Sequence, residues 1–168
     1  MFVPFDSLPS SARVWIYQAN RPLSSPEKEL AATRLREFTG EWAVHGTPIP
    51  TSFTIQHNQF IVLAADESSQ AASGCSIDSS VRVLKDIEGE LGISLFDRSQ
   101  VAFWSEGKVL LIPLAELKEN FRQGILNERS LAFNNLVQSK GAFDNSWLAP
   151  ADETWLKRYI PNPLAKVK

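Results

Sequence analysis

Ten consecutive residues near the middle of the chain carry the side chains best suited to binding or catalysis. They run Ser73-Gly74-Cys75-Ser76-Ile77-Asp78-Ser79-Ser80-Val81-Arg82. Small residues come first and an amphipathic helix follows, so the first amides of that helix lack partners within it. Such amides attract anions, and hydroxyls beside them can add donors. We therefore expect a small-anion site here, with ligand-binding residues Ser73, Gly74, Ser76, Asp78, Ser79 and Arg82, which Arg13 could complete.

Cys75, the only cysteine of the chain, lies in the same motif and suggests an alternative. The dipole at a helix start favours a thiolate, so Cys75 could act as a catalytic nucleophile or redox thiol. Such an enzyme also needs an oriented base, and the sequence places neither His45 nor His57 beside the thiol. A free cysteine that merely fills space, in a loop and cap without ligand, explains the same residues. The sequence leaves these alternatives open.

Several other classes of chemistry are not expected. One cysteine and two histidines give no zinc-type spacing, and no EF-hand loop is present, so we predict no metal and no cofactor. The count of cysteines and histidines alone leaves a carboxylate-bound Mg²⁺ or Ca²⁺ open. The only Gly-Lys pair, Gly107-Lys108, precedes valine, so the chain is not a P-loop ATPase. A net charge of −2 without interleaved cations and aromatics argues against nucleic-acid binding. The apolar runs are too short for a membrane span, and no secretory signal opens the chain, which predicts a cytoplasmic protein.

Alternating and β-branched segments predict the strands that must frame this motif. They lie over 13–18, 51–56, 60–65, 101–104 and 109–112. A first helix is predicted over about 26–43, because Ser24 and Glu27 have capping-box spacing and apolar residues recur at helical intervals after them. A further helix after Pro113 is expected to turn Leu114, Leu117 and Phe121 inward.

The motif itself opens a second predicted helix. Ser76 or Asp78 is its expected cap, and Gly92 its expected stop. Asp78 and Arg82 have the i,i+4 spacing of an ion pair. The expected core stripe is Ile77, Val81, Leu84, Ile87 and Leu91.

The order of elements predicts the fold class. It reads β-α-β-β-α-β, which is the order of a split-βαβ, ferredoxin-like antiparallel sheet in an α+β protein. A hairpin strand and a helix are added, between an N-terminal arm (1–12) and a C-terminal tail (127–168) that wraps over the core. We predict a single domain over 1–168, with another two-layer α+β fold containing a mixed sheet as the alternative.

Three segments resemble a family of small bacterial proteins of uncharacterised function that often carry the label ABC transporter ATPase. They are Ala72–Val81, Phe133–Val137 and Trp155–Tyr159. The resemblance covers nearly the whole chain and implies no activity or catalytic residues. The label conflicts with the sequence, since the phosphate loop and the Leu-Ser-Gly-Gly-Gln signature of such ATPases are both missing.

The leading functional hypothesis is a cytoplasmic, non-enzymatic binding or interaction module. Its ligand would be a small anion at the start of the second helix, or a protein partner. The alternative is an enzyme that uses Cys75. A third hypothesis is a homodimer that associates through surface left by the aromatic tail.

Overall fold

The chain forms helices and antiparallel sheets in a computed structural model, which describes residues 1–162. The predicted α+β class is therefore confirmed. Contacts group the residues into two compact units. Unit 1 holds 1–97 and 136–144, and unit 2 holds 98–135 and, within the described residues, 145–162. A single domain over 1–168 stays a prediction.

Unit 1 contains a three-stranded sheet, two long helices and a small hairpin. Its elements after a short 3-10 helix, η1 (Phe5–Ser7), are β1 (Arg13–Gln18), α1 (Ser25–Glu41), β2 (Ala43–Val44), β3 (Thr47–Pro48), β4 (Thr51–Gln56), β5 (Phe60–Ala65) and α2 (Gly74–Leu91). The three long strands begin and end at the predicted residues. No sequence pattern predicts the β2–β3 hairpin, whose turn holds His45 and Gly46 at positive φ.

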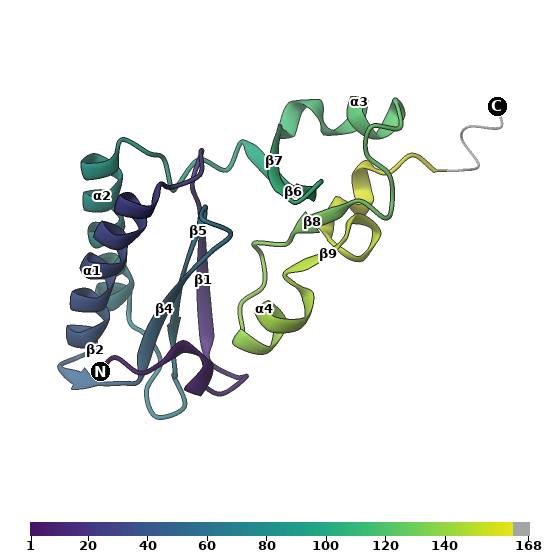
Figure 1. The fold of residues 1–168 in the computed structure, drawn as a ribbon. Coiled ribbons are helices and arrows are strands. Elements are labelled where there is room, and N and C mark those ends of the chain that lie inside the picture. Colours follow the sequence, from purple (N-terminus) through teal and green to yellow (C-terminus); the bar gives the residue numbers. More distant parts are fainter. Residues whose placement is uncertain (163–168) are drawn as a thin grey trace. The chain divides into compact units, whose positions relative to one another are not determined.

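The sheet of unit 1 has the order β1-β5-β4, so its last strand in sequence occupies the centre. β5 pairs antiparallel with both neighbours along its whole length. All six β5 residues are buried, which confirms the prediction of a central strand. Figure 1 shows α1 and α2 on one face of this sheet.

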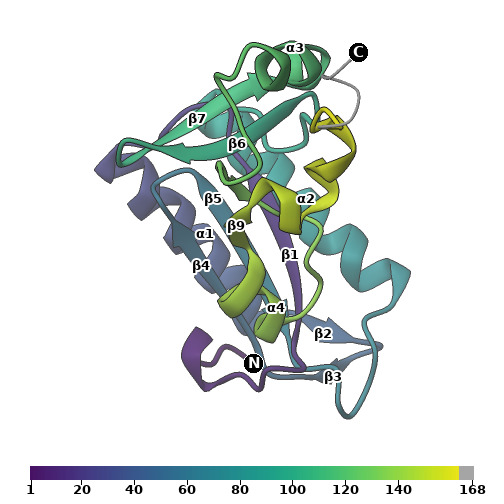
Figure 2. The ribbon, with the colours of Figure 1, turned by 90° about the vertical axis from the view of Figure 1, so that its right-hand side faces the viewer.

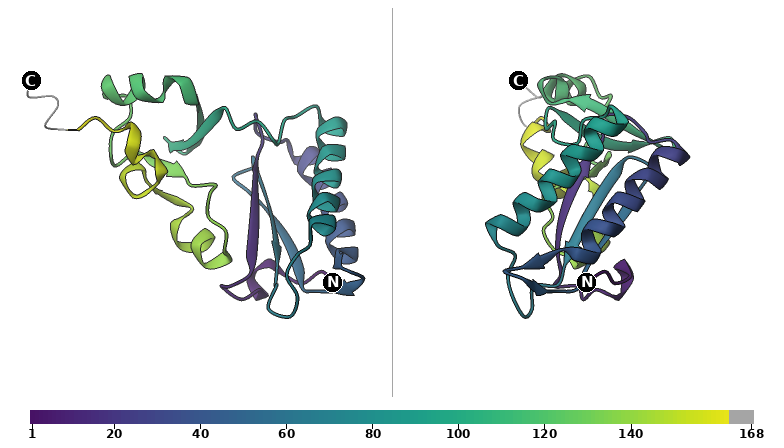
Figure 3. Two further views of the ribbon diagram at one scale, coloured as in Figure 1. Left: turned by 180° about the vertical axis from the view of Figure 1, so that it is seen from behind. Right: turned by 90° about the vertical axis from the view of Figure 1, so that its left-hand side faces the viewer.

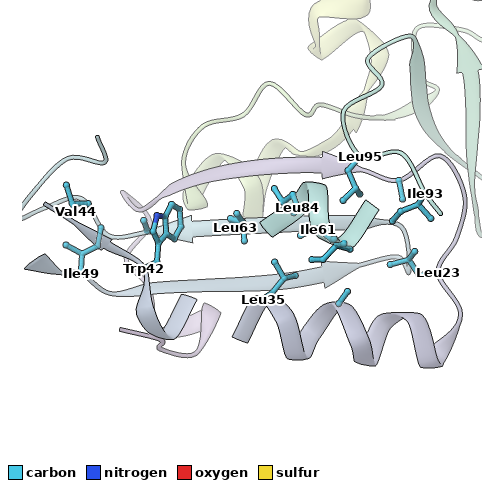
Figure 4. Packing of buried hydrophobic residues seen from close by; sticks show 14 residues of the cluster. Leu23, Leu35, Trp42, Val44, Ile49, Ile61, Leu63, Leu84, Ile93 and Leu95 are labelled. Atoms are coloured by element: carbon cyan, nitrogen blue, oxygen red, sulfur yellow. The ribbon is translucent and has the colours of Figure 1, made fainter. Parts of the chain in front are cut away.

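The helix-facing side of the sheet carries the main hydrophobic cluster of unit 1 (Figure 4). Ile61 and Leu63 of β5 belong to it together with Leu35 of α1 and Leu84 of α2. None of these four side chains is exposed. Burying an aliphatic side chain of this size contributes about 1.5–3 kcal/mol, so this cluster fixes which faces of the two helices point away from the sheet.

Reciprocal bonds at Ser24 and Glu27 start α1, as predicted. The Ser24 hydroxyl accepts from the Glu27 amide at 3.3 Å, and the Glu27 carboxylate accepts from the Ser24 amide at 2.9 Å. Arg21 donates twice to the same carboxylate and once, at 2.8 Å, to the carbonyl of Leu91. This arginine therefore ties the start of α1 to the end of α2.

Segments distant in sequence line both outer edges of this sheet. At the β4 edge the Thr51 amide donates to the carbonyl of Met1, and the Val3 amide donates to that of Thr51. At the β1 edge the Val14 amide donates to the carbonyl of Gln138. The predicted N-terminal arm and part of the predicted tail thus serve as short edge partners.

Unit 2 is built on a four-stranded antiparallel sheet with the order β7-β6-β8-β9. The elements from residue 98 onward are β6 (Gln100–Ser105), β7 (Lys108–Pro113), η2 (Leu114–Glu116), α3 (Leu117–Arg122), β8 (Leu131–Phe133), α4 (Lys140–Ser146), β9 (Leu148–Pro150), η3 (Ala151–Glu153) and η4 (Trp155–Tyr159). Of these, α4 begins in unit 1 and ends in unit 2. The β6–β7 hairpin is visible in Figure 2 and was predicted from its glycine-containing turn.

The core of unit 2 gathers side chains from its sheet and its short helices. Phe103 of β6, Leu117 and Phe121 of α3, and Leu156 of η4 are all buried in one cluster. Leu117 and Phe121 turn inward as predicted. The prediction for Leu114 is wrong: it opens the 3-10 turn η2 before α3 and is 39% exposed.

The split-βαβ topology is not confirmed. Unit 1 reproduces its first five elements, with β5 between β1 and β4. The strand expected fourth in that sheet is β6, which pairs instead with β7 and β8 in unit 2. The predicted wrapping tail supplies β8 and β9 to that second sheet.

Candidate functional site

Ser73 caps α2, in place of the predicted Ser76 or Asp78. Its hydroxyl accepts from the Ser76 amide at 3.2 Å, and its amide donates to the Ser76 hydroxyl at 2.9 Å. Gly74 already belongs to the helix, so the cap lies earlier than predicted and Ser76 becomes the reciprocal partner. The predicted stop is confirmed, since Gly92 ends α2 with a left-handed conformation at φ 63°.

The other serine hydroxyls of the motif are bonded to their own helix. Ser79 donates to the carbonyl of Cys75 at 3.0 Å, and Ser80 donates to that of Ile77 at 2.6 Å. Ser76 and Ser80 are buried with Leu84 and Ile87, whereas Ile77 and Val81 are half-buried. The buried stripe therefore begins one residue earlier than predicted, and it turns two hydroxyls toward the core.

The charges around this helix start include a carboxylate. The Ala72 amide donates to the Glu67 carboxylate, which also lies 3.9 Å from the Arg13 guanidinium. An anion from solution would meet this negative charge near the open amides of α2. Asp78 and Arg82 are both exposed, and within residues 1–162 they form no ion pair with each other.

Cys75 is exposed on the first turn of α2. Among the described residues no base is hydrogen-bonded to its thiol. The histidines lie in hairpin turns, His45 between β2 and β3 and His57 between β4 and β5, and burial lowers the pKa of His57. Within residues 1–162, no three His, Cys, Asp or Glu side chains form a group that could hold a metal ion.

One buried hydrogen bond joins the two helices at this end. The indole of Trp42, just after α1, donates to the carbonyl of Ser76 at 2.9 Å. Trp42 also packs against Phe38 and Trp15, at centroid distances of 5.0 and 5.5 Å. The Trp42 bond therefore links the start of α2 to the end of α1.

The helices α1 and α2 run side by side on the sheet (Figure 3). Residues from both helices line a shallow groove between them. Its volume is about 230 Å³. It is lined by Arg34, Glu37, Phe38 and Glu41 of α1 and by Val83, Asp86 and Glu90 of α2. These positions are spaced by three and four residues on each helix, so they form two facing stripes.

The groove is strongly acidic for a chain with a net charge of −2. Its lining holds four carboxylates and one guanidinium, a formal charge of −4 + 1 = −3. The one cation of the lining, Arg34, lies 2.7 Å from a Glu90 oxygen. The other three carboxylates, of Glu37, Glu41 and Asp86, are exposed. Half-buried Phe38 and Val83 form an apolar floor between the carboxylates.

The sequence did not predict this groove, because the pattern assigns its charged residues to the solvent-exposed faces of two separate amphipathic helices. Helical spacing does place Arg34, Glu37 and Glu41 on one stripe, but no sequence pattern shows that Asp86 and Glu90 lie opposite them. That neighbourhood depends on how α1 and α2 pack on the sheet.

No protein family, curated protein or solved structure matches this chain. The resemblance to the small bacterial family therefore stays a prediction. None of the helices in residues 1–162 combines the length and the apolar character needed to cross a bilayer.

Proposed function

We propose that this chain is a non-enzymatic interaction module whose groove between α1 and α2 binds a basic segment of a protein partner. The observation that carries the proposal is the combination of three exposed carboxylates, Glu37, Glu41 and Asp86, with the apolar floor of Phe38 and Val83. Lysine and arginine side chains carry an aliphatic stem and a charged head, and the groove offers a surface for each part.

The dimensions of the groove indicate the kind of segment that fits. From Arg34 to Glu41 the α1 stripe extends about 10 Å, or two helical turns, at 1.5 Å per residue. An amphipathic helix with cations three or four residues apart presents charges over the same distance. Such a partner could place its cations along the carboxylates and its apolar residues on the floor.

Binding to a designed helical peptide tests the proposal. The probe repeats lysine at every third or fourth position with leucines on the same face, and a variant with glutamate in place of lysine is its control. Fluorescence anisotropy at about 0.01 and 0.15 M ionic strength compares Debye lengths of about 30 and 8 Å. We expect the lysine peptide to bind, and to bind more weakly at the higher ionic strength.

Two charge-matched protein variants locate the binding surface. The first neutralises three groove carboxylates, by Glu37→Gln, Glu41→Gln and Asp86→Asn. The second neutralises three exposed carboxylates of unit 2, by Glu106→Gln, Glu116→Gln and Glu128→Gln. The groove variant should weaken binding at least about tenfold, which corresponds to about 1.4 kcal/mol. Equal weakening in both variants, or no binding of the lysine peptide, would show that the groove is not the site.

The same experiments distinguish the two alternatives from the sequence. Inorganic phosphate should not raise the thermal midpoint; a rise that is lost in a Ser76→Ala, Ser79→Ala variant would support a small-anion site instead. An enzyme with an activated Cys75 would react with iodoacetamide well below pH 8.5, the ordinary pKa of a free cysteine thiol. A rate that tracks a free thiol counts against that enzyme.

A further inference from the structure

Strand β7 forms one outer edge of the sheet in unit 2. It follows β6 in a hairpin (Figure 2). The turn residues Glu106 and Gly107 both have positive φ. Beyond the strand the hairpin pairing continues, because the Leu114 amide donates to the carbonyl of Ser99 at 2.7 Å. This bond determines which β7 residues direct their backbone groups toward β6.

In an antiparallel ladder, hydrogen-bonded pairs alternate with pairs that are not bonded. Since Leu114 bonds to Ser99, the bonded β7 residues are Lys108, Leu110 and Ile112, and the residues between them point their backbone groups outward. The outward residues are Val109, Leu111 and Pro113, the last of which has no N–H. The β7 edge therefore presents the amide and carbonyl groups of Val109 and Leu111.

These four groups have no hydrogen-bond partner within residues 1–162. The edges of the sheet in unit 1 differ, since Thr51 and Val14 already bond to segments beside them. Proteins commonly protect an open edge with a charged or otherwise blunting residue. The middle of β7 carries instead Leu110, whose side chain is 41% exposed.

We propose that β7 pairs antiparallel with β7 of a second copy of this chain, about a two-fold axis at Leu110. In this register Val109 lies opposite Leu111 of the copy, so the four outward groups on each strand are matched with no remainder. Leu110 lies opposite its own counterpart in a non-bonded pair, where the side chains approach most closely. A two-fold axis makes the interface self-complementary.

Side-chain chemistry favours a second copy over an unrelated strand. The same register sets Lys108 opposite Ile112, so the two lysines of the dimer do not face each other. On one face of the extended sheet Leu110 meets its counterpart, and on the other face Val109 meets Leu111. Pro113 and the turn at Gly107 limit the pairing to this short stretch. An edge of this length buries less than the 1,200 Å² or so of standard interfaces, so the dimer is weak and depends on concentration.

Opposite charges at the two-fold axis provide the test. Leu110→Lys and Leu110→Glu each place like charges face to face, and each should be monomeric in sedimentation velocity where the unaltered chain dimerises. Mixed in equal amounts, the two variants should associate, because lysine then meets glutamate. The matched control is Ile125→Lys, which charges a 61% exposed apolar residue of the same unit and should leave dimerisation unchanged.

Amide exchange of the unaltered chain gives a second readout that needs no substitution. The amides of Val109 and Leu111 should become protected as protein concentration rises, whereas the Leu110 amide, already bonded to β6, should be protected throughout. A chain that stays monomeric at all concentrations would overturn the proposal. So would dimerisation that persists in both single variants, or a mixture that gains no association.

Discussion

Ser73 and Ser76 hold the start of α2 by bonding each other's backbone amides, so the cap depends on both hydroxyls. We predict that Ser73→Ala lowers the free energy of unfolding by about 1 kcal/mol, the usual cost of losing a helix cap. Urea unfolding followed by circular dichroism measures the change. Ser79→Ala is the control, because that hydroxyl bonds only within the helix, and it should change the free energy by less than about 0.5 kcal/mol.

At the start of α1, the Arg21 guanidinium and the Ser24 amide together lower the pKa of Glu27 from 4.5 to about 2. A carboxyl whose pKa is lower in the folded state stabilises the fold above its unfolded pKa. That contribution should be present above about pH 4.5 and be lost as the pH falls toward 2.

Glu27→Gln should therefore differ from the unaltered chain most at neutral pH, and the difference should vanish near pH 2. Urea unfolding along a pH series measures it. Because Arg21 and Glu27 lie at the surface, high salt should reduce the difference. A difference that persists unchanged at pH 2 would contradict the pairing.

Trp42 connects α1 to α2 through one buried hydrogen bond, which is an interaction between elements. Trp42→Phe keeps an aromatic ring but removes the indole donor, so the Ser76 carbonyl keeps only its bond within α2. One hydrogen bond contributes about 0.5–1.5 kcal/mol net, and we expect the free energy of unfolding to fall by about that amount. Trp15→Phe is the control, since its indole donates no hydrogen bond within residues 1–162. Equal losses in both variants would assign the effect to packing.

The sequence was sufficient to predict most elements, because their determinants are local. Alternation set the limits of the strand at 51–56, and the spacing of Ser24 and Glu27 set the start of α1. The cap of α2 was less predictable, because four serines compete there and only Ser73 has a reciprocal partner three residues later whose side chain reaches back. Capping preferences allow several serines as the N-cap of α2, and the structure uses only Ser73.

Pairing between distant segments could not be predicted in the same way. The β6 sequence is compatible with any antiparallel sheet. Nothing in it shows whether β6 pairs with β1, as predicted, or with β8, as in the structure. The acidic groove has the same origin, since Glu37 and Asp86 become neighbours only when two helices pack on one sheet. The proposed binding site therefore depends on contacts that single-sequence patterns do not encode.

At the scale of the whole molecule, the two units are interleaved along the chain. Segment 136–144 belongs to unit 1, yet it lies in sequence between two parts of unit 2. Its Gln138 carbonyl accepts from β1, and its Lys140 amide donates to the carbonyl of Ala12. Unfolding unit 1 would free the segment 136–144, which connects the two parts of unit 2, and unfolding unit 2 would free both ends of that segment. We therefore predict that both units unfold in one transition.

Two buried core residues test this coupling, Leu35 in unit 1 and Phe103 in unit 2. Leu35→Ala should cost about 2–5 kcal/mol and Phe103→Ala about 3–5 kcal/mol, as cavity-forming substitutions do. Hydrogen exchange followed by mass spectrometry reports on peptides from both units in one experiment. Each variant should accelerate the exchange of slow amides in both units by a similar factor, because those amides exchange through the same global opening. Acceleration confined to the substituted unit would show instead that the two fold independently.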